Sequence, residues 1–114
     1  MNLDDFTDFQ WLEPWRSSPS GLEVELEREC SSAHPLSGHK AISVGRRDDR
    51  DDVLFFLPDH ALPLAVVHLT WSGKREAHPG WPQTIFYSSL DDWVERCMKR
   101  EQLEFAGRSE ASLI

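Results

Sequence analysis

The stretch that decides the fold runs from Leu64 to Trp93 and reads LAVVHLTWSGKREAHPGWPQTIFYSSLDDW. Its runs at 64–71 and 83–87 are rich in aromatic and β-branched residues, and a loop containing glycine and proline separates them. Such runs predict two strands with an irregular connection between them. The Ser-Leu-Asp-Asp sequence at 89–92 predicts a helix start, because serine caps helices and carboxylates stabilise the first turn.

The helix that starts near residue 89 has the clearest pattern in the chain. Its apolar residues recur at helical spacing and form one stripe: Leu90, Trp93, Val94, Cys97 and Met98. A second helix is predicted over 21–32, because Ser20-Gly21-Leu22-Glu23 has the form of a capping box. Both helices therefore have an apolar side to bury against the strands.

Two further strands are predicted upstream, over 41–46 and 53–57, from their apolar residues. Strands that follow one another with short connections favour an antiparallel meander. We therefore expect an α+β fold, an antiparallel sheet of about four strands with two to three helices packed on one face.

At 114 residues the chain has the size of one domain, and we expect a single domain over 1–114. Residues 1–19 are acidic and aromatic, and we expect an arm that includes a short helix over 4–12. This arm either packs on the body of the domain or docks on another chain. The α+β body is expected over 20–106, followed by a flexible tail over 107–114.

The charge balance limits the classes of partner. The chain carries 20 acidic against 12 basic residues, a net charge of -8, without a basic cluster. Nucleic-acid binding is excluded on this ground, since it needs a basic face, and anionic membrane surfaces are disfavoured. The acidic balance instead favours a protein partner with a basic surface. The sequence shows neither a signal peptide nor an apolar run of about 18 residues, so we expect a cytoplasmic protein.

Motifs for catalysis and for cofactors are absent from the sequence. The five histidines lack the spacing of a zinc site, and the Asp-rich run at 48–52 lacks the order of a calcium-binding loop. Neither a glycine-rich nucleotide loop nor a nucleophile elbow is present. Cys30 and Cys97 fall on apolar helix stripes and are expected to be reduced core residues. We therefore expect no catalytic residue, no metal ion and no cofactor.

The candidates for a binding surface are Trp15, Asp51, Asp52, His68, Trp71 and Trp81. Tryptophan brings a large contact area at a small entropy cost, although each ring can equally fill the core. His68 lies mid-strand with Asp51 or Asp52 within reach, and a histidine beside a carboxylate can act as a general base. The alternative is a half-buried histidine that is hydrogen-bonded across the sheet.

Three functions fit these features. The preferred one is a small acidic protein that binds other proteins without catalysis, as an adaptor or in the manner of an immunity protein. It predicts an exposed patch that contains Trp11, Trp15 or Trp81 beside carboxylates. A structural homodimer, held through the sheet or the N-terminal arm, is an alternative.

The third function is a small ligand-binding or hydrolytic protein that uses His68 on the open face of the sheet. It predicts a concave pocket over Val66, His68 and Thr70. The loop that follows the strand at 64–71 would close this pocket with Glu76 or His78.

The runs DDVLF at 51–55 and VVHLTWSGK at 66–74 resemble a pattern found in small uncharacterised bacterial proteins. The sequence His34-Pro35-Leu36 lies upstream and fits the same pattern, and Trp81-Pro82 and Trp93 fit it downstream. The resemblance covers residues 20–98. It implies a stand-alone bacterial protein of about this size, and it implies no activity.

Overall fold

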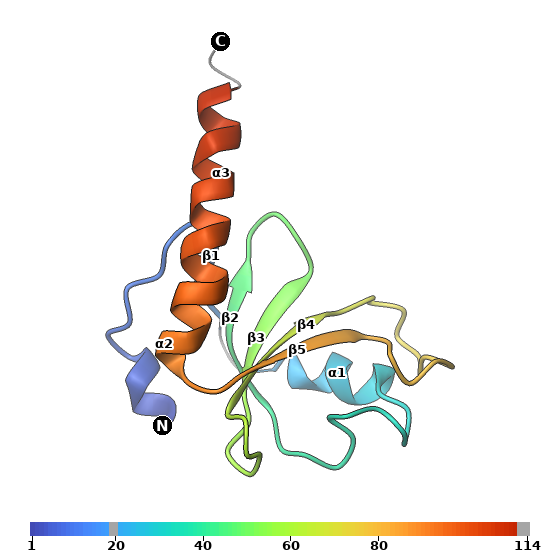
Figure 1. Ribbon diagram of the computed structural model, residues 1–114. Helices are drawn as coiled ribbons and strands as arrows, with labels where there is room; N and C mark the ends of the chain where they lie inside the picture. The colour runs from blue at the N-terminus through green and yellow to red at the C-terminus, as the bar shows by residue number, and fades with distance from the viewer. Residues whose placement is uncertain (19–20, 112–114) are drawn as a thin grey trace.

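The computed structural model describes residues 1–18 and 21–111, and its centre is an antiparallel sheet of five strands (Figure 1). Each strand pairs with the next one along the chain, so the sheet is a meander. The strands are β1 (Trp15–Ser17), β2 (Ile42–Arg47), β3 (Asp52–Phe56), β4 (Leu64–His68) and β5 (Gln83–Tyr87). The α+β class and the antiparallel order are confirmed, and β1 is an additional strand from the segment expected to be an arm.

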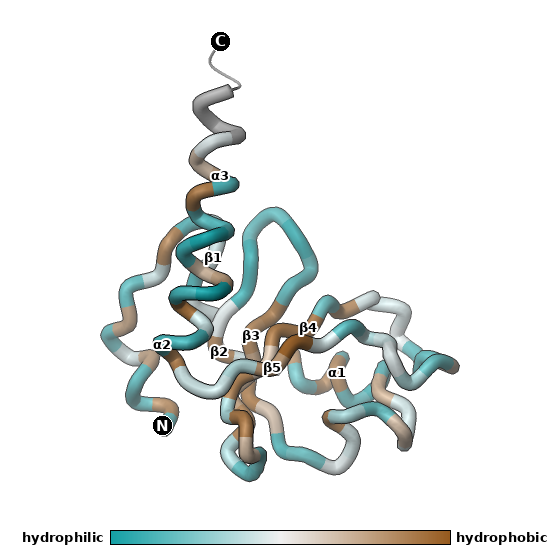
Figure 2. The backbone as a smooth tube through the Cα atoms, in the orientation of Figure 1, coloured by the Kyte–Doolittle hydropathy of each residue, from teal (hydrophilic) through white to brown (hydrophobic). Residues whose placement is uncertain are grey.

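The strands β3 and β4 lie at the centre of the sheet and are buried on both sides. Their sequences, DVLFF and LAVVH, are almost continuously apolar, as expected for strands without a solvent face. The side chains of Leu54 and Val66 point to one face, and those of Val53 and Val67 point to the other. Figure 2 shows hydrophobic residues gathered on these central strands, whereas the turn between β2 and β3 is hydrophilic.

Helices cover both faces of the sheet, which corrects the expectation that they pack on one face. Helix α1 (Glu23–Glu29) packs on the face of Val53. Helix α2 (Leu90–Trp93) and the π-helical η2 (Val94–Met98) pack on the face of Leu54, called here the α2 face. Both faces need a cover, because a single helical layer would leave the apolar side chains of the other face in water.

Helix α3 (Lys99–Ala111) continues directly from η2. The cap predicted before α2 is confirmed, since Ser89 Oγ accepts the Asp92 N–H at 3.0 Å. The helix runs through the segment expected to be a flexible tail, of which residues 112–114 lie outside the described residues. Its far end stands clear of the sheet (Figure 1). Within residues 1–18 and 21–111, no helix has the length and apolar content needed to cross a membrane.

The segment before β1 packs on the α2 face of its own chain. It begins with the 3-10 helix η1 (Leu3–Phe6), which replaces the longer helix expected over 4–12. The Trp11 ring lies edge-on to Trp93, with the ring centroids 5.8 Å apart. A Cβ atom at Gly45 would lie 2.4 Å from the Trp11 ring, so β2 admits this ring only where it has glycine. The aromatic residues of the arm therefore complete the core in cis.

Helix α1 runs from Glu23 to Glu29, shorter at both ends than the predicted helix. The capping box was expected to start at Ser20, which lies outside the described residues. The Glu23 carboxylate accepts the N–H groups of Gly21 at 2.9 Å and Ser43 at 3.1 Å. Although burial disfavours the charge, these hydrogen bonds lower the pKa of Glu23 below its ordinary value. Glu23 thereby ties the start of α1 to β2.

Candidate functional site

A groove of about 290 Å³ lies on the α2 face of the sheet, between the start of β5 and helix α3. The strands form its floor, because Asp52, His68 and Gln83 stand opposite one another in register across β3, β4 and β5. We call it the Trp81 groove. Its lining residues are Arg50, Asp52, Val66, His68, Trp81, Gln83, Ile85, Tyr87, Cys97 and Glu101.

The His68 ring is oriented by Asp52 on the neighbouring strand. His68 Nδ1 donates a hydrogen bond to Asp52 Oδ1 at 2.7 Å, and Arg50 Nε lies 3.7 Å from Asp52 Oδ2. Because Nδ1 keeps its proton to donate to Asp52, the neutral ring has Nε2 as its acceptor. Within the described part of the chain, no residue hydrogen-bonds with Nε2, and the His68 side chain is 39% exposed. The groove therefore offers a ligand one oriented acceptor.

Two large apolar side chains stand exposed at the groove. The exposed fractions are 40% for Trp81 and 57% for Ile85. Ile85 stands opposite Val66 in the register of β4 and β5, and Val66 is 8% exposed. An exposed apolar patch of this kind, beside polar groups, is typical of an interaction surface.

The buried His34 fixes the chain at the start of β5. Its Nε2 donates to the Pro82 carbonyl oxygen at 2.9 Å, and its Nδ1 accepts the Leu36 N–H at 3.0 Å. A neutral ring with its proton on Nε2 satisfies both bonds. Because Trp81 directly precedes Pro82, this contact also sets the position of the indole at the groove.

Glu29 fixes the other end of the connection between β4 and β5. Its fully buried carboxylate accepts the N–H groups of Thr70 at 2.8 Å and Trp71 at 2.9 Å. Burial raises the pKa of Glu29, and contact with the Glu25 carboxyl adds to the rise. The two hydrogen bonds hold Trp71 at φ 57°, a conformation that costs a non-glycine residue about 1–2 kcal/mol.

The wall of the groove on the helix side includes Glu101 of α3, which contacts both β1 and β2. Glu101 Oε1 accepts the indole N–H of Trp15 at 2.7 Å, and Oε2 lies 3.0 Å from an Arg47 guanidinium nitrogen. The buried Arg47 also bonds the Asp49 carboxylate at 2.9 Å. Although burial disfavours the charge, Asp49 and Glu101 raise the pKa of Arg47. Trp15 is therefore an anchor of the core and does not line the groove.

The buried end of the groove is formed by Tyr87 and Cys97, and both groups stay protonated at neutral pH. Burial raises the pKa of the Cys97 thiol to about 12 and raises the pKa of Tyr87 above its ordinary value. Burial likewise raises the pKa of Cys30 to about 11. Both cysteines are free and buried, so their expected place in the core is confirmed. A thiol in this state is a poor nucleophile.

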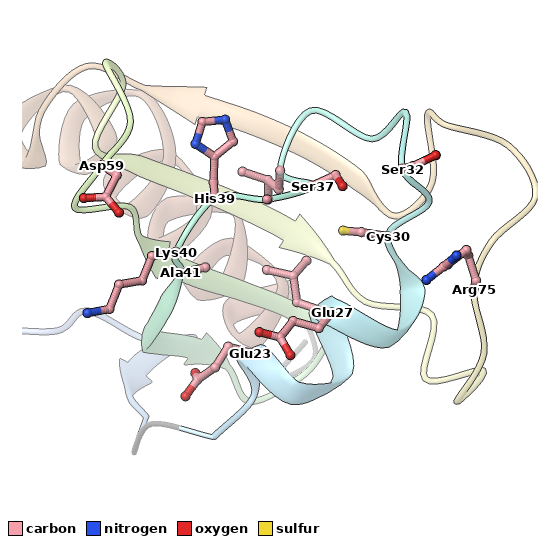
Figure 3. A pocket seen from close by; sticks show the side chains of 13 residues that line it. Glu23, Glu27, Cys30, Ser32, Ser37, His39, Lys40, Ala41, Asp59 and Arg75 are labelled. Atoms are coloured by element: carbon pink, nitrogen blue, oxygen red, sulfur yellow. The ribbon is translucent and has the colours of Figure 1, made fainter.

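A second cavity, of about 610 Å³, lies between α1 and the connections around it (Figure 3). Leu26, Leu36 and Cys30 are among its apolar lining residues. Figure 3 shows Lys40 and Arg75 at opposite ends of this cavity, so its two cationic groups do not converge on one point. A ligand site needs convergent polar groups, which favours the Trp81 groove as the candidate site.

The groove brings together Asp52, His68 and Trp81 from the candidates named from the sequence, and it leaves the others outside. The Asp51 side chain is exposed, and its carbonyl oxygen accepts the Leu69 N–H. Trp71 is 45% exposed but does not line the groove. The loop residues expected to close a pocket over His68 lie elsewhere, and Glu76 instead accepts the Thr70 hydroxyl at 2.8 Å.

Ile85 and Glu101 also line the groove, and neither was predicted from the sequence as a binding residue. The alternation of Gln83, Ile85 and Tyr87 places these side chains on one face of β5, and this signal was present in the sequence. Nothing in the sequence indicates that Glu101 turns back toward β1.

Among residues 1–18 and 21–111, no group of three His, Cys, Asp or Glu side chains is placed to hold a metal ion. No protein-family model, curated protein or solved structure matches this chain. The function is therefore inferred from the geometry of the Trp81 groove.

Proposed function

We propose that this protein binds a basic partner protein through the Trp81 groove, without catalysis. The observation that carries the proposal is the exposure of Trp81 and Ile85 beside the carboxylates of Asp52 and Glu101. A half-exposed indole on a fixed backbone supplies a large contact area without much ordering cost. Such residues are the ones that dominate the free energy of binding at protein interfaces.

The charge of the surface favours a partner rich in lysine and arginine. The groove is lined by the carboxylates of Asp52 and Glu101 and by one guanidinium, that of Arg50. The exposed Asp51 lies next to Asp52 in the chain, and the whole chain carries a net charge of -8. Attraction of this kind raises the association rate and weakens as salt is added.

The His68–Asp52 pair supports a second candidate function, hydrolysis of a small substrate with His68 Nε2 as the general base for water. Its supporting observation is the 2.7 Å bond that orients the ring. A His68→Gln variant separates the two functions, because it removes the base while leaving the apolar patch of Trp81 and Ile85 intact. Hydrolysis lost in this variant, with partner binding retained, would establish the second candidate.

The test of the proposed function uses two tryptophan variants with the protein immobilised on beads. Trp81→Ala removes the groove indole, and Trp71→Ala is the matched control, since Trp71 is similarly exposed but lies outside the groove. Proteins retained from a lysate of the native host are quantified by mass spectrometry. We expect a basic protein that Trp71→Ala retains and that Trp81→Ala loses at least about tenfold.

Salt provides the second readout of the same experiment. Retention should fall as the salt concentration rises from about 0.05 to 0.5 M, because screening weakens attraction between exposed charges. Equal loss of the retained protein in both tryptophan variants, or retention of acidic proteins alone, would show that the proposal is wrong.

A further inference from the structure

The outer edge of β5 lies directly beside the Trp81 groove, and no strand of the described residues pairs with it. Within residues 1–18 and 21–111, β5 pairs with β4 alone, and in Figure 1 it crosses the front of the molecule with no other element drawn in front of it. Its sequence, QTIFY, contains no charged residue, no proline and no glycine. Proteins usually protect an edge strand with charges, proline, a bulge or a covering segment. β5 has no charged residue, no proline and no bulge along its length.

The register of the sheet shows which backbone groups of β5 point outward. The Leu69 N–H donates to the Asp51 carbonyl oxygen, and the Leu57 N–H donates to that of Pro63, so odd-numbered residues of this hairpin form its hydrogen-bonded pairs. Hydrogen-bonded pairs alternate along antiparallel strands, so the even-numbered residues of β4 turn their backbone groups to β5. Val66, for example, is paired in this way with Ile85.

Gln83, Ile85 and Tyr87 consequently bond to β4, whereas Thr84 and Phe86 present their N–H and C=O groups at the edge. Within residues 1–18 and 21–111, no hydrogen bond reaches these outward groups. Pro82 follows the same alternation, and its outward carbonyl oxygen is the one that His34 binds. The rest of the edge can therefore pair with an added strand.

We propose that an extended segment of the basic partner pairs with β5 as an additional strand, with alternate side chains in the Trp81 groove. This inference rests on the proposed function and names its binding mode. The N–H and C=O groups of Thr84 and Phe86 supply the backbone bonds. Side chains of the segment that point to the α2 face meet Trp81 and Ile85, so these positions take apolar residues. Its lysine or arginine residues meet the carboxylates of the groove.

Charge favours this occupant over a second copy of the chain. Each copy has a net charge of -8, so pairing β5 with β5 would bring two acidic surfaces together. A basic segment is instead attracted by the negative electrostatic field of the chain. Pairing between two copies is treated below as an outcome that overturns the proposal.

The first experiment selects peptides from a random library, displayed on phage, against the full-length protein. We expect enrichment of peptides that combine lysine or arginine with apolar residues at every second position. The best peptide is then synthesised with each backbone amide methylated in turn. Strand pairing predicts that methylation of every second amide lowers the affinity about three- to tenfold, while the intervening amides are insensitive.

The second experiment changes β5 itself. Thr84→Pro removes an outward N–H without removing a bond to β4, and Thr84→Val is the matched control that loses the hydroxyl and keeps the N–H. We expect Thr84→Pro to weaken the selected peptide about three- to tenfold and Thr84→Val to change its affinity less than about twofold. Should Thr84→Pro fail to fold, the affinities of the methylated peptides for the unchanged protein still test strand pairing.

The outcomes separate this inference from the proposed function. Peptide binding that Trp81→Ala abolishes, but that shows no alternation on methylation, overturns strand pairing and leaves the proposed function standing. Absence of basic peptides from the selection overturns both. A dimer in light scattering that Thr84→Pro dissociates assigns the edge to a second copy and overturns the basic partner.

Discussion

The two edges of the sheet differ, because the β1 edge is protected by the fold and the β5 edge is open. β1 has three residues, its Trp15 is 1% exposed, and Arg16 pairs with Asp48. β5 has five residues without a charge, and the nearby Trp81 is 40% exposed. Each edge thus has a tryptophan close to it, but only that of β1 is used by the fold. The difference fits the proposal that β5 pairs with a partner, whereas Trp15 anchors β1 in the fold.

The largest effect is expected from exchanging these tryptophans for alanine. Trp15→Ala should lower the free energy of unfolding by about 3–5 kcal/mol, because it empties a core position and leaves Glu101 without its indole donor. Trp81→Ala should lower it by less, about 1 kcal/mol, since 40% of the side chain is exposed and no core position is emptied. Urea unfolding of both variants measures this difference. A similar loss in both would remove the distinction between the edges.

The second prediction concerns the buried carboxylate that holds the connection leading into β5. Glu29→Gln should cost about 1–3 kcal/mol, because the amide oxygen can accept one N–H while the amide nitrogen faces the other. The control is Glu27→Gln on the exposed side of the same helix, which should cost less than about 0.5 kcal/mol. Chemical unfolding at neutral pH measures both. Equal costs would show that Glu29 does not hold the connection.

The pH dependence of the same variant sharpens this test. Because the pKa of Glu29 is raised in the folded state, the folded protein binds this proton more tightly than the unfolded chain does. The contribution of Glu29 to stability is therefore greatest below its ordinary pKa of 4.5 and declines as the pH rises through the raised value. Glu29→Gln cannot titrate, so its cost should be largest in acid and smaller at neutral pH. A cost that grows with pH would contradict the raised pKa.

Most of the strands could be predicted from local patterns, because β3, β4 and β5 each carry apolar or alternating residues of strand length. β1 could not be predicted in this way. Its three residues become a strand only through pairing with β2, and the side chain that anchors it comes from α3. Likewise, apolar residues on both faces of β3 and β4 were visible in the sequence, but the number of faces covered is a tertiary property.

The groove was predictable in part. The pairing of Asp52 with His68 follows once the hairpin of β3 and β4 is in register, and the sequence already indicated this neighbourhood. The exposure of Ile85 depends on where η2 and α3 leave the sheet uncovered, which no local pattern records. The end of β4 shows the same limit, because the strand ends at His68 and Trp71 has a left-handed backbone, although the run suggested a strand as far as Trp71.

The smallest effect is expected from the ion pair at the β1 edge. Arg16→Ala should change the free energy of unfolding by about 0–1 kcal/mol, since both side chains of the Arg16–Asp48 pair are more than half exposed. The Arg16→Ala variant should also stay a monomer, because β1 has only three residues to offer to a strand of a second copy. Light scattering checks this point, and a dimer of Arg16→Ala would mean that charge, rather than length, protects β1.

The hydrogen bond between Trp15 and Glu101 joins residues that are 86 positions apart in the chain. During synthesis at about 5–20 residues per second, Trp15 is made roughly 4–17 s before the carboxylate that will hold it. Through that interval the aromatic residues of the N-terminal segment lack the helix that covers them, and the growing chain offers them to any chaperone at the ribosome. The strand that is translated first is therefore the one whose place in the sheet is secured last.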